Sequence, residues 1–115
     1  GIETTQDYDD MLEELLDRFG EPPKAVLNLL TIARIKALAH RSYVTEIKQM
    51  GKDLKITLYE RAKLNPAGFP ELMQKYRRGL QFKNEQEPKF ILTLVGNLLT
   101  ALTDFLNELE KLVEE

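Results

Sequence analysis

The chain has 115 residues, of which 43% are hydrophobic and 30% are charged, and this composition is typical of one folded domain. Sixteen Lys and Arg against 19 Asp and Glu give a net charge of -3, which disfavours a domain built mainly to grip nucleic-acid phosphates. The absence of Cys excludes disulfides and thiolate chemistry, and the single His40 excludes a multi-histidine metal site. No apolar run is long enough to span a membrane. We therefore expect one soluble, cytoplasmic domain over residues 1–115, with residues 1–6 as a flexible lead-in.

Two helices are expected at the start of the chain. Residues 8–19 form one face of an amphipathic helix, because apolar residues recur at spacings of three and one. Gly20 can take the left-handed conformation that ends this helix, and two prolines then prevent its continuation. A second helix is expected from Pro22 or Pro23 to about His40. It is apolar over most of its circumference, so it is either buried on more than one side or serves an interface.

The hydrophobic period then changes to two. Residues 54–58 alternate strictly, as a half-buried strand does, and residues 43–49 could pair with them across a turn at residues 51–53. A second hairpin is expected from strands at residues 80–82 and 90–94. The later run could equally be the first turn of the last helix, because short apolar runs are ambiguous.

Two more helices complete the pattern. One begins at Asn65 as its N-cap, with Pro66 at the first helical position, and ends at Gly79. The last helix carries an apolar stripe from Val95 to Val113, about three residues wide per heptad. A stripe this wide favours packing on the domain's own sheet, and a helical oligomerisation module is the alternative.

The expected order is α-α-β-β-α-β-β-α, which is an α+β fold. It has two N-terminal helices, two β-hairpins forming a mainly antiparallel sheet, an intervening helix and a long C-terminal amphipathic helix.

No catalytic set can be assembled from the sequence, and we name no catalytic, cofactor, metal or protein-interaction residue. His40 suits the negative end of the second helix, and Ser42 would point elsewhere. The run Lys75–Arg78 is the densest basic cluster and keeps a small nucleic-acid-binding module open as an alternative, although Tyr76 falls on the core face. Five carboxylates on the first helix are expected to form a solvated face, not a metal site: Asp7, Asp9, Asp10, Glu13 and Glu14.

One stretch of the chain resembles a known family. It consists of Glu14–Pro23 (ELLDRFGEPP), then Val26, Asn28-Leu29-Leu30 and the run Ile32–Lys36. It is similar to the C-terminal domain of bacterial transcription-repair coupling factor, whose pattern is roughly E-L-x-D-R-F-G-x-x-P-x-x-V-x-N-L-L-x-x-A-R-x-K. The similarity extends from about Asp7 to Val113, and it matches in pattern more than in identity over the second half.

The resemblance implies a non-catalytic regulatory domain of a DNA translocase that removes stalled RNA polymerase from damaged DNA. In that family the domain docks on an N-terminal module resembling part of the excinuclease B subunit. It thereby covers the surface used by the excinuclease A subunit until polymerase is engaged. The resemblance implies no cofactor in this domain and no membrane partner, while ATP and Mg belong to the motor of the parent protein.

Overall fold

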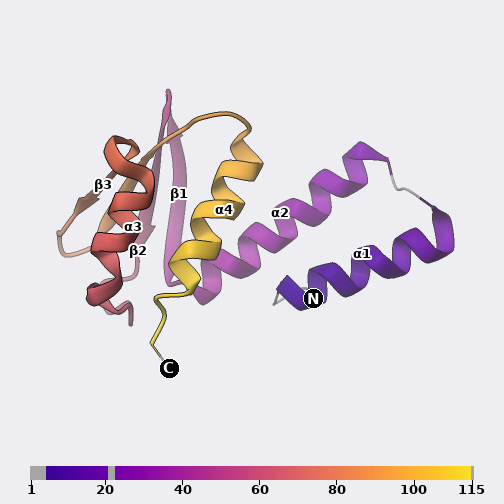
Figure 1. The fold of residues 1–115 in the computed structure, drawn as a ribbon, viewed down its shortest axis with the longest axis horizontal. Coiled ribbons are helices and arrows are strands. Elements are labelled where there is room, and N and C mark those ends of the chain that lie inside the picture. Colours follow the sequence, from indigo (N-terminus) through magenta and orange to yellow (C-terminus); the bar gives the residue numbers. More distant parts are fainter. Residues whose placement is uncertain (1–4, 21–22, 115) are drawn as a thin grey trace.

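The computed structural model describes residues 5–20 and 23–114, except for the side chains of residues 15–19. The described helices are α1 (Thr5–Phe19), α2 (Lys24–Arg41), α3 (Phe69–Tyr76) and α4 (Leu98–Glu110). The described strands are β1 (Val44–Met50), β2 (Asp53–Leu58), β3 (Leu80–Lys83) and β4 (Lys89–Thr93). The predicted α+β fold and its element order are confirmed (Figure 1).

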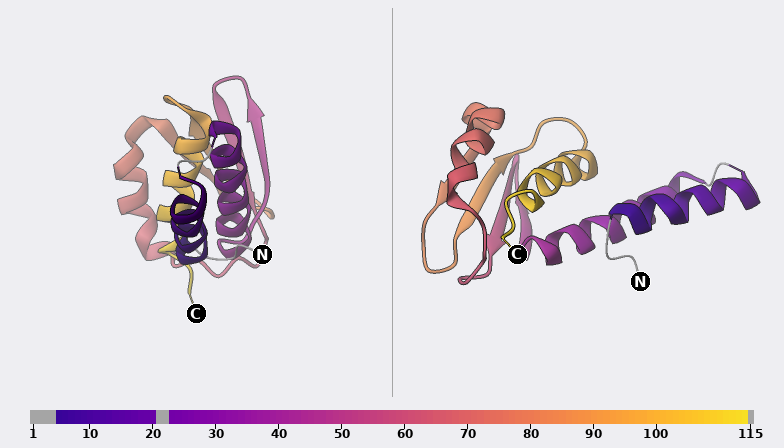
Figure 2. Two further views of the ribbon diagram at one scale, coloured as in Figure 1. Left: turned by 90° about the vertical axis from the view of Figure 1, so that its right-hand side faces the viewer. Right: turned by 60° about the horizontal axis from the view of Figure 1, so that its bottom comes forward.

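The strands form one antiparallel sheet in the order β1-β2-β4-β3. Each hairpin pairs its own two strands, and β2 pairs with β4 to join the hairpins, with Ile56 opposite Phe90. The helices α3 and α4 lie on one face of this sheet (Figures 1 and 2). Alternate strand residues point toward these helices and form the core, because side chains on a strand alternate between its two faces.

The core is built from aliphatic strand residues and an aromatic cluster. Phe90 and Phe105 are fully buried, and their ring centroids lie 5.4 Å apart in an edge-to-face arrangement. Phe69 lies 5.0 Å from Phe82 and 5.6 Å from Phe90, so α3 is fixed to both strands of the second hairpin. Tyr76 adds an edge contact to Phe105 at 5.7 Å. These contacts join α3, α4 and the sheet into one body.

The helices α1 and α2 form an arm that projects from this body on the side of β1 (Figures 1 and 2). The C-terminal half of α2 is anchored, since Ile35 and Leu38 are buried in the core. The N-terminal half of α2 extends outward, and α1 folds back along it. The Arg34 guanidinium lies 5.3 Å from the centre of the Tyr8 ring and links the two helices.

The N-terminal boundaries follow the expected signals, with one correction. The helix α1 begins at Thr5, so Thr5 and Gln6 are helical and not part of a flexible lead-in. Gly20 adopts a φ of 72°, the left-handed conformation predicted after the helix end. The helix α2 begins at Lys24, so Pro23 lies at its N-cap position and not in its first turn, whereas the predicted role of Pro22 lies outside the described residues.

The later boundaries differ in two places. Asn65 caps a short 3-10 turn by accepting a hydrogen bond from the N–H of Ala67 at 3.0 Å, and α3 follows it but ends at Tyr76, before Gly79. The helix α4 begins at Leu98, not at Val95. The cause is local, because the Asn97 side chain accepts a hydrogen bond from the N–H of Thr100 and so starts the helix there. The ambiguous run before it is the strand β4.

Candidate docking surface

The projecting part of α2 exposes an apolar stripe. Val26, Leu29 and Ile32 are spaced three residues apart and therefore lie along one side of the helix. Leu29 is 67% exposed, and the other two are also exposed. Arg34 lies on another side of α2, where it contacts α1. The stripe of Val26, Leu29 and Ile32, called the α2 stripe below, is thus an apolar surface that the domain itself leaves uncovered.

The outer side of α1 is acidic and exposed. The five carboxylates predicted to be solvated lie on α1, and all five are exposed: Asp7, Asp9, Asp10, Glu13 and Glu14. Gln6 donates a hydrogen bond to Asp10 at 2.7 Å along the helix. In the part of the chain that the structure describes, no group of three or more His, Asp or Glu side chains is placed to hold a metal ion. The arm therefore combines an apolar strip on one helix with an acidic surface on the other.

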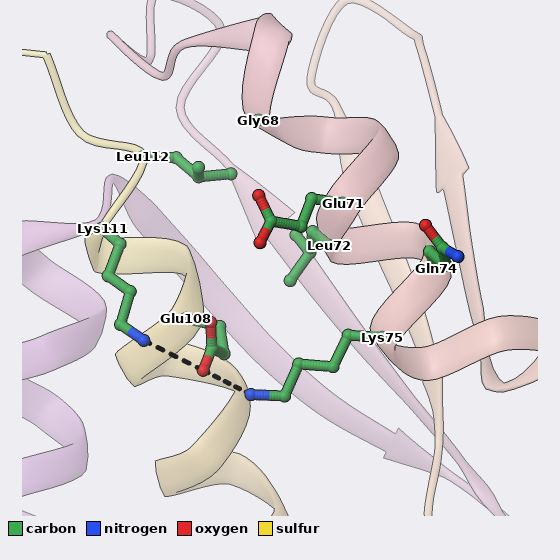
Figure 3. Close-up of a pocket in the computed structure, with 8 residues that line it drawn as sticks. All are labelled: Gly68, Glu71, Leu72, Gln74, Lys75, Glu108, Lys111 and Leu112. Carbon is green, nitrogen blue, oxygen red and sulfur yellow. Dashed lines mark hydrogen bonds and ion pairs between the residues drawn. The ribbon is translucent and has the colours of Figure 1, made fainter.

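A second surface feature is a groove of about 540 Å³ between α3 and the end of α4 (Figure 3). Leu72 and Leu112 are its aliphatic lining residues. Glu108 on α4 accepts hydrogen bonds from Lys75 of α3 and from Lys111, the latter at 3.1 Å (Figure 3). The two lysines and Glu108 carry a net charge of +1, which the carboxylate of Glu71, also lining the groove, balances. The ion pairs therefore join α3 to α4, and the groove has no net charge to attract a ligand.

The pKa values of two groups at this junction are shifted, and the same contacts contribute to both shifts. The hydrogen bond from Lys75, followed by that from Lys111, holds the pKa of Glu108 below its ordinary value of 4.5. Burial, and then the negative charges of Asp104 and Glu108, raise the pKa of the Tyr76 hydroxyl above its ordinary value of 10.0. Both shifts favour the charge states already present at neutral pH, so neither group is prepared for proton transfer there.

The predicted chemistry candidates do not assemble into a site. His40 lies in the last turn of α2, as predicted, and is exposed. Ser42 is fully buried, and its N–H donates to the carbonyls of Leu38 and Ala39 at the end of the helix. A buried hydroxyl behind the helix end is not placed to act with an exposed imidazole as a nucleophile.

The basic run Lys75–Arg78 is partly used for folding. Lys75 is held by Glu108, and Tyr76 packs edge-on against Phe105, as its core-face position predicted. Arg77 has a φ of 52°, in the left-handed region, where the chain turns from α3 into β3. Arg77 and Arg78 remain exposed. Because the Tyr76 ring packs in the core, however, the run does not offer the exposed aromatic on which a base would stack.

The C-terminal stripe is buried inside the domain. Four of its residues are at most 6% exposed, because α4 packs on the sheet and on α2: Leu102, Phe105, Leu106 and Leu109. Val95 also fits the heptad spacing, but it precedes the helix and is 81% exposed. Packing on the domain's own sheet is therefore confirmed, and α4 offers no seam to an oligomerisation partner.

The sequence did not single out the α2 stripe. It showed only that α2 is apolar around most of its circumference, which is compatible with full burial or with an interface. A groove of about 270 Å³ between α2 and β1 was also missed, because it depends on how two segments pack. The signal that could have pointed to the stripe is that apolar residues are distributed around nearly the whole circumference of α2.

None of the helices in the described part of the chain has the length and apolarity needed to cross a bilayer.

Comparison with known proteins identifies relatives of one kind. The profile of the TRCF domain matches residues 1–69. The transcription-repair-coupling factor of Haemophilus influenzae is 32% identical over 95 residues, which is 83% of this chain and 8% of that protein. The Bacillus subtilis and Staphylococcus haemolyticus proteins of the same name are 34% and 38% identical over 61 residues, which is 53% of this chain and 5% of each.

A solved structure shares the fold. It is described as the C-terminal domain of transcription-repair coupling factor, and it superposes with a TM-score of 0.77 at 20% identity. The match covers 96% of this chain and 73% of that chain. The chain spans only 5–8% of the length of the curated relatives quoted above. Since the TRCF profile covers more than half of the sequence, the chain belongs to the TRCF domain family of transcription-repair coupling factors.

Proposed function

We propose that this chain is a non-catalytic regulatory domain that docks on the N-terminal excinuclease-B-like module of its own parent protein. In the docked state it masks the surface that recruits the excinuclease A subunit, and engagement of stalled RNA polymerase on damaged DNA releases it. Membership of the TRCF domain family supports this proposal, because the relatives are named transcription-repair-coupling factors. The ATP and Mg needed for movement along DNA belong to the motor of the parent protein. The parent protein works in the cytoplasm.

The α2 stripe is the observation that carries the docking role. Leu29 is 67% exposed although it is a large aliphatic residue on a helix whose other end is fully anchored. A single exposed Leu needs no explanation, but three apolar residues aligned on a projecting helix mark a surface for a partner. The arm that carries this stripe projects away from the sheet (Figure 2), and the exposed side chains of the stripe are accessible to another module.

A tethered contact of this kind works at low intrinsic affinity. Two modules on one chain meet at an effective concentration in the mM range when the linker permits, so even a weak interface is mostly closed. Contacts inside one chain are usually modest in area and partly polar, and the acidic side of α1 can set the orientation of such a contact. Polymerase opens it only by binding the undocked state more tightly than the docked one.

The proposal is tested by titrating the 115-residue chain against the separately expressed excinuclease-B-like module of its parent protein. We expect saturable binding that the excinuclease A subunit displaces. Leu29→Gln should weaken binding at least about tenfold, because a buried aliphatic anchor contributes more than about 1.4 kcal/mol at an interface centre.

Val95→Gln is the matched control, since Val95 is an even more exposed aliphatic residue that lies on the body and not on the arm. It should bind like the unchanged chain. No binding at about 1 mM module would contradict docking by this domain. Equal losses for both variants would contradict the role of the α2 stripe.

A further inference from the structure

A groove of about 270 Å³ lies at the base of the arm, between α2 and β1. Its apolar lining residues come from both elements, with Ile35 and Ala39 on α2 and Val44 and Ile47 on β1. Ile35 is buried, whereas the other three residues remain partly exposed. The groove is therefore an apolar depression that no side chain of the described residues closes.

A β-bulge in the edge strand builds one wall of this groove. The strand β1 ends the sheet order, and its pairing with β2 is irregular between Val44 and Glu46. Val44 lies opposite Leu58. Ile47, three residues later, lies opposite Ile56, which is only two residues from Leu58. The extra residue in β1 thus places Val44 and Ile47 on the same face of the sheet, whereas regular alternation would put them on opposite faces.

The groove continues the α2 stripe. Residues three and four apart lie side by side on a helix, so Ile32 of the stripe adjoins both Ile35 and Lys36, which line the groove. The same spacing joins Leu29 to Ile32. The stripe and the groove therefore form one surface along the exposed side of α2, which runs from Val26 to the base of the arm at β1 (Figure 1).

One cation beside the groove is not balanced by the domain. Lys36 is exposed and forms neither an ion pair nor a side-chain hydrogen bond with any residue the structure describes. Glu46 also lines the groove, but its carboxylate lies 3.7 Å from the ammonium of Lys55 on β2. An apolar groove next to an unbalanced ammonium is complementary to an apolar side chain that has a carboxylate beside it.

We propose that the groove binds an apolar anchor side chain of the module that docks on the α2 stripe, and that a carboxylate beside this anchor pairs with Lys36. The inference rests on the proposed function, because the anchor belongs to the same excinuclease-B-like module. Side chains that fill a pocket in an interface often contribute most of the binding energy. The docked module then contacts α2 and β1 together, so docking holds the arm against the sheet.

Filling the groove from within tests the anchor. Ala39→Leu places a larger aliphatic side chain in the depression, so the excinuclease-B-like module should bind at least about tenfold more weakly. Leucine is a good helix former and Ala39 is only partly buried, so the variant should unfold at about the same temperature. Ala25→Leu is the matched control, because it makes the same change beside Leu29, outside the groove. It should bind as tightly as the unchanged chain or more tightly.

A second variant tests the charge and leaves the apolar lining intact. Lys36→Glu places a carboxylate against the expected one, so it should also weaken binding at least about tenfold. Because Lys36 is exposed, the change should not unfold the chain. Lys52→Glu makes the same change of charge in the turn between β1 and β2, and it should bind like the unchanged chain.

The titration separates this inference from the docking role itself. Weaker binding in Leu29→Gln with unchanged binding in Ala39→Leu and Lys36→Glu would overturn the groove and leave docking on the α2 stripe in place. A loss in only one of the two groove variants, or equal effects in a variant and its control, would also overturn it. If the module does not bind the unchanged chain at about 1 mM, the docking role and the groove both fall.

Discussion

Gly68 and Leu112 illustrate how closely single residues fit at the junction of α3 and α4. Gly68 has a φ of -86°, so its backbone is one that any residue adopts. A Cβ atom built on it would lie 2.2 Å from Cδ2 of Leu112, which is closer than two carbon atoms can approach. A larger residue at this position would therefore force the Leu112 side chain to shift, whereas the turn itself does not call for glycine.

We predict that Gly68→Ala lowers the free energy of unfolding by about 1 kcal/mol, at the low end for overpacking because a half-buried leucine can partly move aside. Combining it with Leu112→Ala should cost less than the sum of the two single changes, by about 1 kcal/mol, because the clash is gone. Urea unfolding of the four proteins measures this difference. Additive changes in the free energy of unfolding would show that the Leu112 side chain moves aside without destabilising the fold.

Glu108 makes the α3–α4 junction sensitive to acid. Its pKa is lowered in the folded chain by Lys75 and then by Lys111, so the carboxylate stabilises the fold at neutral pH. This contribution is complete above the ordinary value of 4.5 and is lost as the pH falls through the lowered pKa.

We predict that Glu108→Gln lowers the stability at pH 7 and also reduces the loss of stability on acidification below about pH 4.5. The effect is small, because the ion pairs lie at the surface. Thermal unfolding between pH 7 and pH 3 measures it, with Glu71→Gln on the same groove as the control. An unchanged acid profile in Glu108→Gln would show that the lysine contacts do not hold in solution.

At the scale of elements, hydrophobic periodicity predicted the type of each element, and capping residues predicted where helices end. The strand β2 follows from the strict alternation of residues 54–58, β1 is the partner expected for it at residues 43–49, and Gly20 ends α1 with the expected positive φ. The start of α4 was misplaced because the heptad spacing includes Val95, whereas Asn97 begins the helix by capping it. The spacing of apolar residues does not show which side chain forms the capping hydrogen bond, and that bond decides where a helix starts.

Exposure and edge position could not be predicted from the sequence, because they are properties of the packed molecule. The residues of α2 are similar in hydrophobicity at both ends, yet Leu38 is buried in the core while Leu29 is exposed to solvent. The strand β1 becomes an edge only because β2 pairs with β4. Pattern reasoning therefore identified the elements of both candidate surfaces but not the surfaces themselves.

The whole molecule consists of a cohesive body and an arm whose outer helix, α1, has few contacts with the rest of the chain. The body has an aromatic core and two central strands, β2 and β4, that are each paired on both sides, whereas α1 is held mainly through α2. Because the arm projects from the body, the molecule is elongated, with extents of 47 × 33 × 22 Å (Figure 1). Elements with few buried contacts open at lower free energy than the core of the same protein.

We predict that amides of α1 exchange with solvent at least about tenfold faster than those of β2 and β4, because the arm can open without unfolding the body. Hydrogen exchange followed by mass spectrometry measures this. Binding of the parent's excinuclease-B-like module should slow exchange in the arm selectively. Equal protection of the arm and the sheet in the free chain would show that the two unfold as one unit.

The attachment of the arm has a mechanical consequence. Only two residues separate Arg41, at the end of α2, from Val44, at the start of β1. The N–H of Ser42 is bonded back to the last turn of α2 at 3.0 Å, and Arg41 is fixed to Glu110 of α4 at 2.7 Å. The connection is therefore short and fixed at both residues, so α2 is rigidly joined to the sheet and acts on it as a lever. A torque applied at the tip of the arm would be delivered at its base to β1 and to the end of α4.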